Sequence, residues 1–259
     1  MSKWISTHIK LILYAYIALS VVAILLLSYN NVLNPIYIWL IFLAVTIAFF
    51  VSVNIISYKC IQKISSDFES TCIPYEYIEF LTKCYKNNPK NTVNQMNYAV
   101  ALLLDKNNIE KARMVMELIQ VEKIPFKQTN LKYIYYNNLC IIYLELNELA
   151  QAEEAYKKAL YYYKQIKNEA YKAQCESRIA SLACELAIKK EDIEKALSYL
   201  TRVRTDTLLA RVSHALALAK IQIMQNEAEK AREQLNFVIE HGQYISEGQE
   251  AKELLSKLT

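Results

Sequence analysis

Six cysteines and three histidines are the side chains of this sequence best suited to metal binding or nucleophilic chemistry. No two cysteines form a Cys-x-x-Cys pair, and the histidines are scattered, at His8, His214 and His241. Zinc sites need thiolates or imidazoles at short, regular spacings. The sequence therefore predicts no metal and no other cofactor. Several cysteines fall on apolar helix faces, where a thiol behaves as a small hydrophobe, as expected in a reducing compartment.

Paired carboxylates, which acid–base catalysis would use, occur at Glu153-Glu154 and Glu191-Asp192. Both pairs fall in turns or on polar helix faces, so we interpret them as solvated surface. Phosphate-binding loops need glycine for close backbone approach, and the chain has only Gly242 and Gly248. No nucleophile motif is present, and we predict that the protein is not an enzyme.

The elements that position these residues are predicted to be helices. Two glycines and four prolines in 259 residues are too few for a sheet protein joined by tight turns, which needs residues that tolerate positive φ. An all-α fold is therefore expected.

Two uncharged apolar stretches lie near the start of the chain, at residues 11–28 and 36–56. A bilayer core roughly 30 Å thick needs about 20 apolar residues in a helix. We predict a transmembrane hairpin over residues 1–58, with spans at about 9–29 and 36–57 that contact the lipid bilayer. A cleaved signal peptide is the disfavoured alternative, because no small-residue cleavage site follows the first stretch and a second span comes at once.

Basic residues set the expected orientation of the hairpin. Residues 1–66 contain Lys3, Lys10, Lys59 and Lys63 and no acid, and the lysines flank the two spans on the same side. The positive-inside rule then places both termini in the cytoplasm, and a bacterial cytoplasmic membrane is the expected location. From residue 67 onward, 26 basic residues balance 26 acidic ones, which argues against a nucleic-acid partner.

Small residues recur every four positions along one face of the second span, at Ala44, Ala48 and Ser52. Such residues let two helices approach closely. We interpret this face as packing against the first span, with homodimerisation as the alternative. Neither uncharged stretch, residues 11–28 or 36–56, contains an acidic residue, a lysine or an arginine of the kind that marks an ion or proton path, so we expect an anchor and not a transporter.

A repeated pattern follows a predicted juxtamembrane linker at residues 59–74 and extends over residues 75–259. Four segments share a polar turn, an alanine and a bulky residue four positions later, with the alanines at Ala112, Ala152, Ala196 and Ala231. These alanines are 40, 44 and 35 residues apart, and an amphipathic helix precedes each segment. The repeating unit is therefore a helix, a short turn and a second helix.

At this point the chain resembles the tetratricopeptide repeat (TPR) family, a family of α-solenoids. The second unit carries the resemblance through seven residues: Tyr136, Leu139, Cys140, Tyr143, Ala152, Tyr156 and Ala159. Residues 75–89 resemble the second helix of an earlier, degenerate unit, and residues 247–258 resemble a C-terminal capping helix. Spacings above the 34 residues of the family leave a divergent array or another α-solenoid as alternatives.

The resemblance implies that protein or peptide partners bind in a concave groove lined by the first helix of each unit. Carried over by position, that groove would expose Asn94, Asn97, Ala101, Asn137, Ile141, Arg178, Ser181, Glu185 and Lys220. Amide side chains there could bond an extended peptide. The basic clamp of chaperone-binding members is not evident, since Asn97 and Ala101 stand at corresponding positions.

The expected function is a membrane-anchored TPR-like scaffold or adaptor that binds protein partners at the cytoplasmic membrane face. The alternative is a regulatory receptor that binds a short peptide in the repeat groove. Tyrosines cluster at residues 133–136 and 161–163. We interpret them as packing between repeats, with an aromatic partner-binding patch as the alternative.

Overall fold

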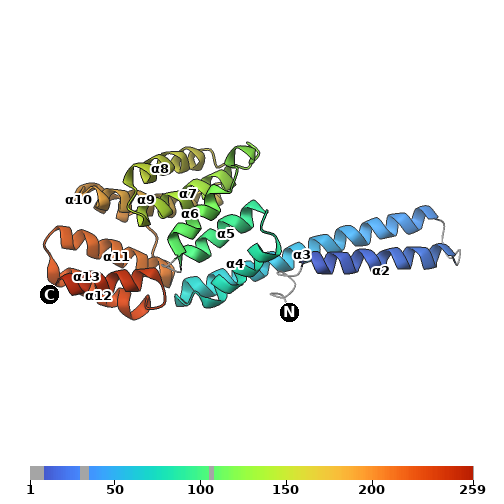
Figure 1. Cartoon of the computed structure of the whole chain (residues 1–259), viewed down its shortest axis with the longest axis horizontal. Coiled ribbons are helices and arrows are strands. Elements are labelled where there is room, and N and C mark those ends of the chain that lie inside the picture. Colours follow the sequence, from blue (N-terminus) through green and yellow to red (C-terminus); the bar gives the residue numbers. More distant parts are fainter. Residues whose placement is uncertain (1–8, 30–34, 105–107, 259) are drawn as a thin grey trace. The chain divides into compact units, whose positions relative to one another are not determined.

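The structure is a computed structural model that describes residues 9–29, 35–104 and 108–258. Within these ranges every regular element is a helix and none is a strand, as the scarcity of glycine predicts. The chain divides into two compact units, Met1–Ser66 and Asp67–Thr259. Each unit is described by itself (Figure 1).

The first unit contains helix α2 (Ile9–Tyr29) and most of helix α3 (Pro35–Thr71). Tyr16 of α2 stacks on Phe49 of α3 with ring centroids 4.2 Å apart, and its hydroxyl lies 2.9 Å from Thr46 Oγ1. In contrast, the predicted packing residues are exposed: Ala44, Ala48 and Ser52. The described contacts between the helices therefore use a different face of α3 from the one that the small-residue pattern indicates.

One helical stretch among the described residues, Trp39–Thr71, is long and apolar enough to cross a membrane. The apolar stretch described in α2, Tyr14–Leu26, is shorter than that criterion requires. The sequence predicts two membrane-spanning helices, whereas only one of the described helices is long and apolar enough to cross a membrane.

The predicted linker at residues 59–74 is largely helical, because α3 continues through Thr71. No glycine or proline interrupts residues 36–73. The helix ends only where Cys72 adopts φ 55° and Pro74 follows, the usual way in which a left-handed residue and a proline stop a helix. The division between the two units falls inside this helix.

The second unit is a succession of helices joined by short turns. Their bounds are α4 Tyr75–Asn87, α5 Thr92–Leu103, α6 Ile109–Glu117, a 3₁₀ turn η2 Val121–Lys123, α7 Thr129–Glu145, α8 Leu149–Lys164, α9 Glu169–Lys189, α10 Ile193–Leu200, α11 Leu208–Met224, α12 Ala228–His241 and α13 Ser246–Lys257. The hairpins α5–α6, α7–α8, α9–α10 and α11–α12 are the four predicted units, and α13 follows them as predicted.

The four repeated alanines lie where the two helices of each hairpin cross. Ala112, Ala152, Ala196 and Ala231 are all fully buried, with 0% of their surface exposed. A side chain larger than a methyl group would hold the helices apart, so the repeated alanine marks the closest approach within each unit. The hairpins thus follow from a local pattern of the sequence.

The turn between the two helices has the same backbone geometry in three units. Asn147, Glu191 and Asn226 adopt φ values of 59°, 57° and 62°. The following N–H donates to a carbonyl five residues earlier, as in Glu148 N–H to Tyr143 O at 2.8 Å. This hydrogen bond completes a Schellman motif, which ends the first helix and reverses the chain in about two residues.

Consecutive hairpins share cores. One buried cluster runs continuously from Met96 of α5 to Leu186 of α9. A second cluster joins Val212 of α11 and Leu235 of α12 to Phe68, at the end of α3. Residues from the start of the second unit therefore pack against its last helices, which the ring contact of Tyr75 with Tyr244 also shows, at 5.9 Å between centroids.

Candidate functional site

The residues predicted to line a partner groove are mostly engaged with other parts of the protein. Asn94 donates through Nδ2 to the Cys84 carbonyl at 3.0 Å and so holds the end of α4. Asn137 is only 6% exposed and lies beside Asn138. Asn97, Ile141 and Ser181 are half-buried, Ala101 is buried, and Arg178 is exposed.

Glu185 and Lys220, predicted as groove residues, form an ion pair with each other. Lys220 Nζ lies 3.2 Å from Glu185 Oε2 and 3.0 Å from Glu250 Oε1. Burial alone would lower the pKa of Lys220, but the two carboxylates outweigh it and raise the pKa above its usual value. These ion pairs connect α9, α11 and α13. Because Lys220 is already paired with two carboxylates, its charge is not available to a carboxylate of a partner.

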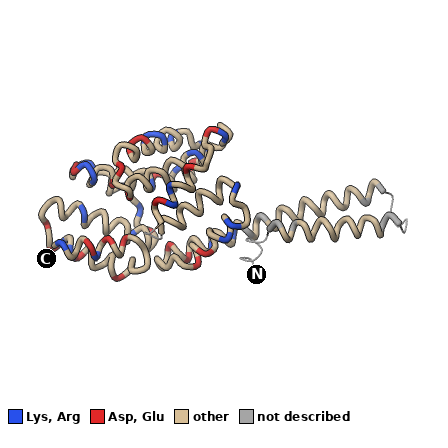
Figure 2. The backbone as a smooth tube through the Cα atoms, viewed as in Figure 1, with Lys and Arg blue, Asp and Glu red and all other residues tan. Residues whose placement is uncertain are grey.

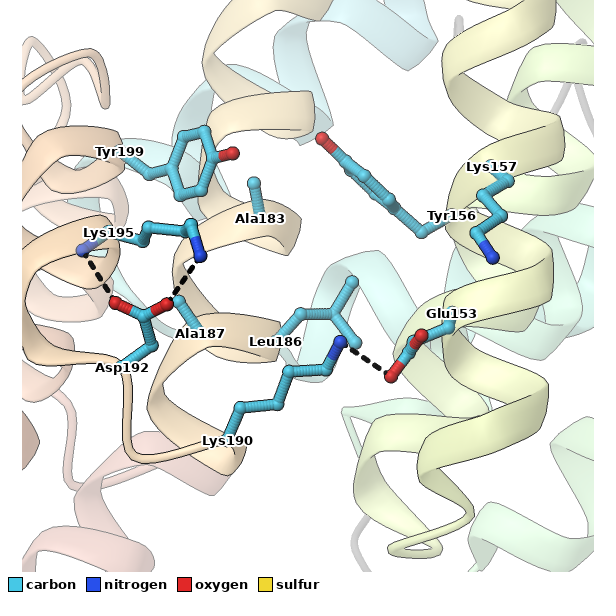
Figure 3. A pocket seen from close by; sticks show the side chains of 10 residues that line it. All are labelled: Glu153, Tyr156, Lys157, Ala183, Leu186, Ala187, Lys190, Asp192, Lys195 and Tyr199. Carbon is cyan, nitrogen blue, oxygen red and sulfur yellow. Dashed lines mark hydrogen bonds and ion pairs between the residues drawn. The ribbon is translucent and has the colours of Figure 1, made fainter.

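A recess of about 230 Å³ opens instead between α8, α9 and α10 (Figure 3). Its lining residues come from the second helix of one hairpin and both helices of the next: Glu153, Tyr156, Lys157, Ala183, Leu186, Ala187, Lys190, Asp192, Lys195 and Tyr199. The floor is apolar, made by two alanines and a leucine of α9, and charged side chains surround it (Figure 3).

Two ion pairs fix the charged side chains around this recess. Lys190 Nζ lies 2.7 Å from Glu153 Oε1, and this hydrogen bond lowers the pKa of Glu153. Asp192 caps α10 by accepting from the Lys195 backbone N–H at 3.1 Å, and it pairs with Lys195 Nζ at 2.6 Å. Two of the four carboxylates predicted to be solvated surface, Glu153 and Asp192, therefore have ion-pair partners on the rim.

Two tyrosines face one another across the recess. The hydroxyls of Tyr156 and Tyr199 point inward from opposite sides, and neither has a hydrogen-bond partner among the described residues (Figure 3). Burial and, secondarily, the nearby Tyr199 raise the pKa of Tyr156, so its phenol stays protonated and can donate. Lys157 is exposed on the rim and forms no ion pair in the described part of the chain.

This arrangement suits recognition of a side chain. The apolar floor can take one aliphatic or aromatic group, and the two phenols can bond to polar atoms beside it. Because the other charged rim residues pair with each other, Lys157 leaves a single positive charge for a carboxylate of the partner. The recess therefore fits an apolar side chain flanked by an acidic residue.

Sequence reasoning missed this recess because its walls come from different hairpins. The spacing of Glu153 and Lys157, four residues apart on a helix, was a local signal of a charged face. Nothing in the sequence alone tells which residues of α9 and α10 oppose that face.

The tyrosine clusters belong mainly to the packing between helices. Tyr133 and Tyr135 are buried, at 0% and 7% exposed, and Tyr136 stacks on Tyr162 with centroids 5.6 Å apart. Tyr161 is the exposed member, at 59%. Packing is therefore the role of most of these rings.

Cys140 and Cys184 are not activated as nucleophiles. Burial raises the pKa of Cys140 and of Cys184 to about 12, so both remain protonated at physiological pH. Among the described residues, no group of three or more His, Cys, Asp and Glu side chains could hold a metal ion.

A family model described as "Tetratricopeptide repeat protein 21 ARM repeat" matches residues 83–215, from within α4 to within α11. Comparison with curated proteins and with solved structures gives no match. Armadillo repeats are about 40 residues long, which agrees with the alanine spacings of 40 and 44 residues in the matched region. Because the match covers more than half of the chain, this protein belongs to the tetratricopeptide repeat protein 21 ARM-repeat family of TPR-related helical repeats.

Proposed function

We propose that this protein is a membrane-anchored helical-repeat adaptor that binds protein partners at the cytoplasmic face of a bacterial cytoplasmic membrane. Proteins of helical-repeat families are typically scaffolds without catalytic activity. The repeat unit supplies the binding surface, and the first unit supplies the anchor.

One observation carries the proposed anchoring: the apolar residues of α2 and α3 are exposed. Leu19 is 72% exposed and Trp39 60%, and only 6% of the most apolar part of Trp39–Thr71 is buried. Charged residues are nearly absent from these helices before α3 reaches Lys59, whereas they cover the repeat unit (Figure 2). A core helix of a water-soluble protein would bury such side chains, and a bilayer would accommodate them.

Cell fractionation tests the anchor. The full-length protein should sediment with membranes and resist extraction by carbonate at high pH. A variant with Val45→Lys and Ile47→Lys should be released in larger part, since each lysine near the centre of a span costs about 2.5–3.5 kcal/mol. The matched control places the same two lysines at Ile61 and Ser65, near the end of α3. Recovery of the unmodified protein in the soluble fraction would contradict the anchoring.

Binding at the α8–α9–α10 recess is tested with the full-length protein in detergent. The probe is an array of synthetic peptides, each with one leucine, phenylalanine or tyrosine beside an aspartate. Peptides that bind should lose affinity on Lys157→Glu by about tenfold, the typical size of a charge-assisted contact. Lys164→Glu is the matched control, because Lys164 is exposed two turns further along α8 and lies outside the recess. Equal losses in both variants would count against this site.

The alternative, a regulatory receptor with a peptide in the concave groove, draws less support from the contacts. Asn94, Glu185 and Lys220 already bond within the protein. A peptide in that groove would have to replace those bonds, which costs free energy before any is gained.

A further inference from the structure

A second hollow, of about 470 Å³, lies between helices α5, α6 and α7. The start of α5, the end of α6, η2 and the start of α7 line it through Lys90, Thr92, Gln95, Leu118, Gln120, Lys123, Ile124, Pro125, Gln128 and Leu131. Amides and lysines dominate this lining, and it contains no carboxylate. Its chemistry therefore differs from that of the recess between α8 and α10.

The chain around this hollow is locally basic. Residues 80–104 contain three lysines and no acid, and residues 118–144 contain three lysines and only Glu122. Lys90, Lys123 and Lys127 are exposed, and none of them forms an ion pair in the described part of the chain. Their charges thus remain available to an anionic partner.

Large apolar side chains protrude beside these lysines. Phe126 and Leu118, at 75% and 65%, are the most exposed large hydrophobic residues described in the repeat unit. Phe126 sits on a defined turn, since the Gln128 N–H donates to the Pro125 carbonyl at 2.9 Å. The exposed Phe126 and Leu118 side chains and the unpaired lysines together give this part of the surface both apolar groups and positive charge, the combination found on surfaces that bind anionic membranes.

We propose that this loop surface, made by Lys90, Leu118, Lys123, Phe126 and Lys127, docks the repeat unit onto an anionic membrane surface. Protruding aromatic and aliphatic side chains enter the headgroup region, and lysines around them pair with lipid phosphates. A peptide site would need an apolar floor, as in the α8–α9–α10 recess, whereas polar side chains predominate in the lining of this hollow and the large apolar side chains beside it are exposed.

The proposal rests on the proposed anchoring in one respect only. A tethered repeat unit meets the membrane at high effective concentration, so a weak interfacial contact suffices. The loop surface itself requires only that the membrane be anionic, as cytoplasmic leaflets are.

A tryptophan reporter tests this docking in the full-length chain. The only tryptophans are Trp4 and Trp39, both in the first unit, so Trp4→Phe and Trp39→Phe leave the repeat unit free for a single reporter. Phe126→Trp then places an indole at the tip of the loop surface. The protein is reconstituted into nanodiscs of phosphatidylcholine, or of phosphatidylcholine with phosphatidylglycerol, each with lipids brominated on the acyl chains, which quench an inserted indole.

The reporter at residue 126 should be quenched in the nanodiscs that contain phosphatidylglycerol, and little in phosphatidylcholine alone. Each change of Lys90, Lys123 or Lys127 to Gln should lower the docking equilibrium constant about fivefold, the effect of one lysine near an anionic surface. The matched control is Tyr244→Trp in the same background, because Tyr244 is also exposed but lies in the turn between α12 and α13, whose residues do not line the hollow. That control should not be quenched.

Absence of quenching at residue 126 in both lipid mixtures would overturn the proposal and would leave the loop surface to an acidic protein partner. Equal quenching at residues 126 and 244 would overturn it as well. If the protein does not co-purify with nanodiscs, the anchoring fails, but the soluble protein mixed with phosphatidylglycerol vesicles still tests the loop surface by the same quenching.

Discussion

Lys220 of α11 lies 3.2 Å from Glu185 of α9, and this ion pair ties together two hairpins that are adjacent along the array. Glu250 of α13 approaches the same ammonium group at 3.0 Å. One ammonium group thus pairs with two carboxylates from different helices. The cluster stabilises the C-terminal end of the repeat unit, where the capping helix packs.

Replacing Lys220 with methionine should destabilise the repeat unit. The substitution keeps an unbranched side chain one atom shorter than lysine but leaves Glu185 and Glu250 without a cation. We expect a loss of about 1–3 kcal/mol, below the cost for a fully buried pair because the carboxylates are partly exposed. Urea denaturation followed by circular dichroism measures it.

The matched control for this prediction is Lys83→Met. Lys83 pairs with Glu79 one turn away on α4, and both side chains are about half exposed. That change should cost no more than about 0.5 kcal/mol. Similar losses of stability in the two variants would show that the Lys220 cluster contributes no more to the free energy of unfolding than an exposed ion pair does.

Exchanging residues between equivalent turns should alter stability in opposite directions. Glu191 and Asn226 occupy the same left-handed position in two hairpins, at φ 57° and 62°. Asparagine tolerates this conformation better than glutamate, so Glu191→Asn should stabilise and Asn226→Glu should destabilise, each by about 0.5–1 kcal/mol. Thermal unfolding of the two variants gives the signs, and equal signs would contradict the shared geometry.

Removing the Phe68 ring should weaken the contact between the start and the end of the repeat unit. Phe68 is 6% exposed, stacks on Tyr77 and packs in the same cluster as Val212. Phe68→Ala should cost about 3 kcal/mol, typical of a buried phenylalanine. Phe126→Ala is the control and should leave stability unchanged, because that ring is 75% exposed. Hydrogen exchange should locate the loss of protection in α11 and α12.

The buried thiols should resist alkylation in the folded protein. Because burial raises the pKa of Cys140 and of Cys184 to about 12, almost no thiolate is present at about pH 8. Iodoacetamide should therefore modify neither residue until denaturant is added, as peptide mass spectrometry would show. Rapid modification of either cysteine under native conditions would mean that its helix opens locally.

The sequence by itself determined the local architecture. Alternation of apolar positions, alanines at the crossing points and the scarcity of glycine predict helical hairpins, and Ala112, Ala152, Ala196 and Ala231 are all buried as that pattern requires. These features involve residues less than about 40 positions apart, where the geometry of one hairpin decides every contact. Most of the expected linker is helical, because residues 59–71 contain no glycine or proline that would interrupt α3.

Only the tertiary structure decided which faces of successive hairpins oppose one another. The pairing of Lys220 with Glu185, the approach of Tyr199 to Tyr156 and the contact of Phe68 with Val212 each join different hairpins. Each depends on the rotation between neighbouring units, which accumulates along the array and is set by packing rather than by periodicity. Periodicity placed Glu185 and Lys220 on helices, but it did not indicate that their partners lie in other units.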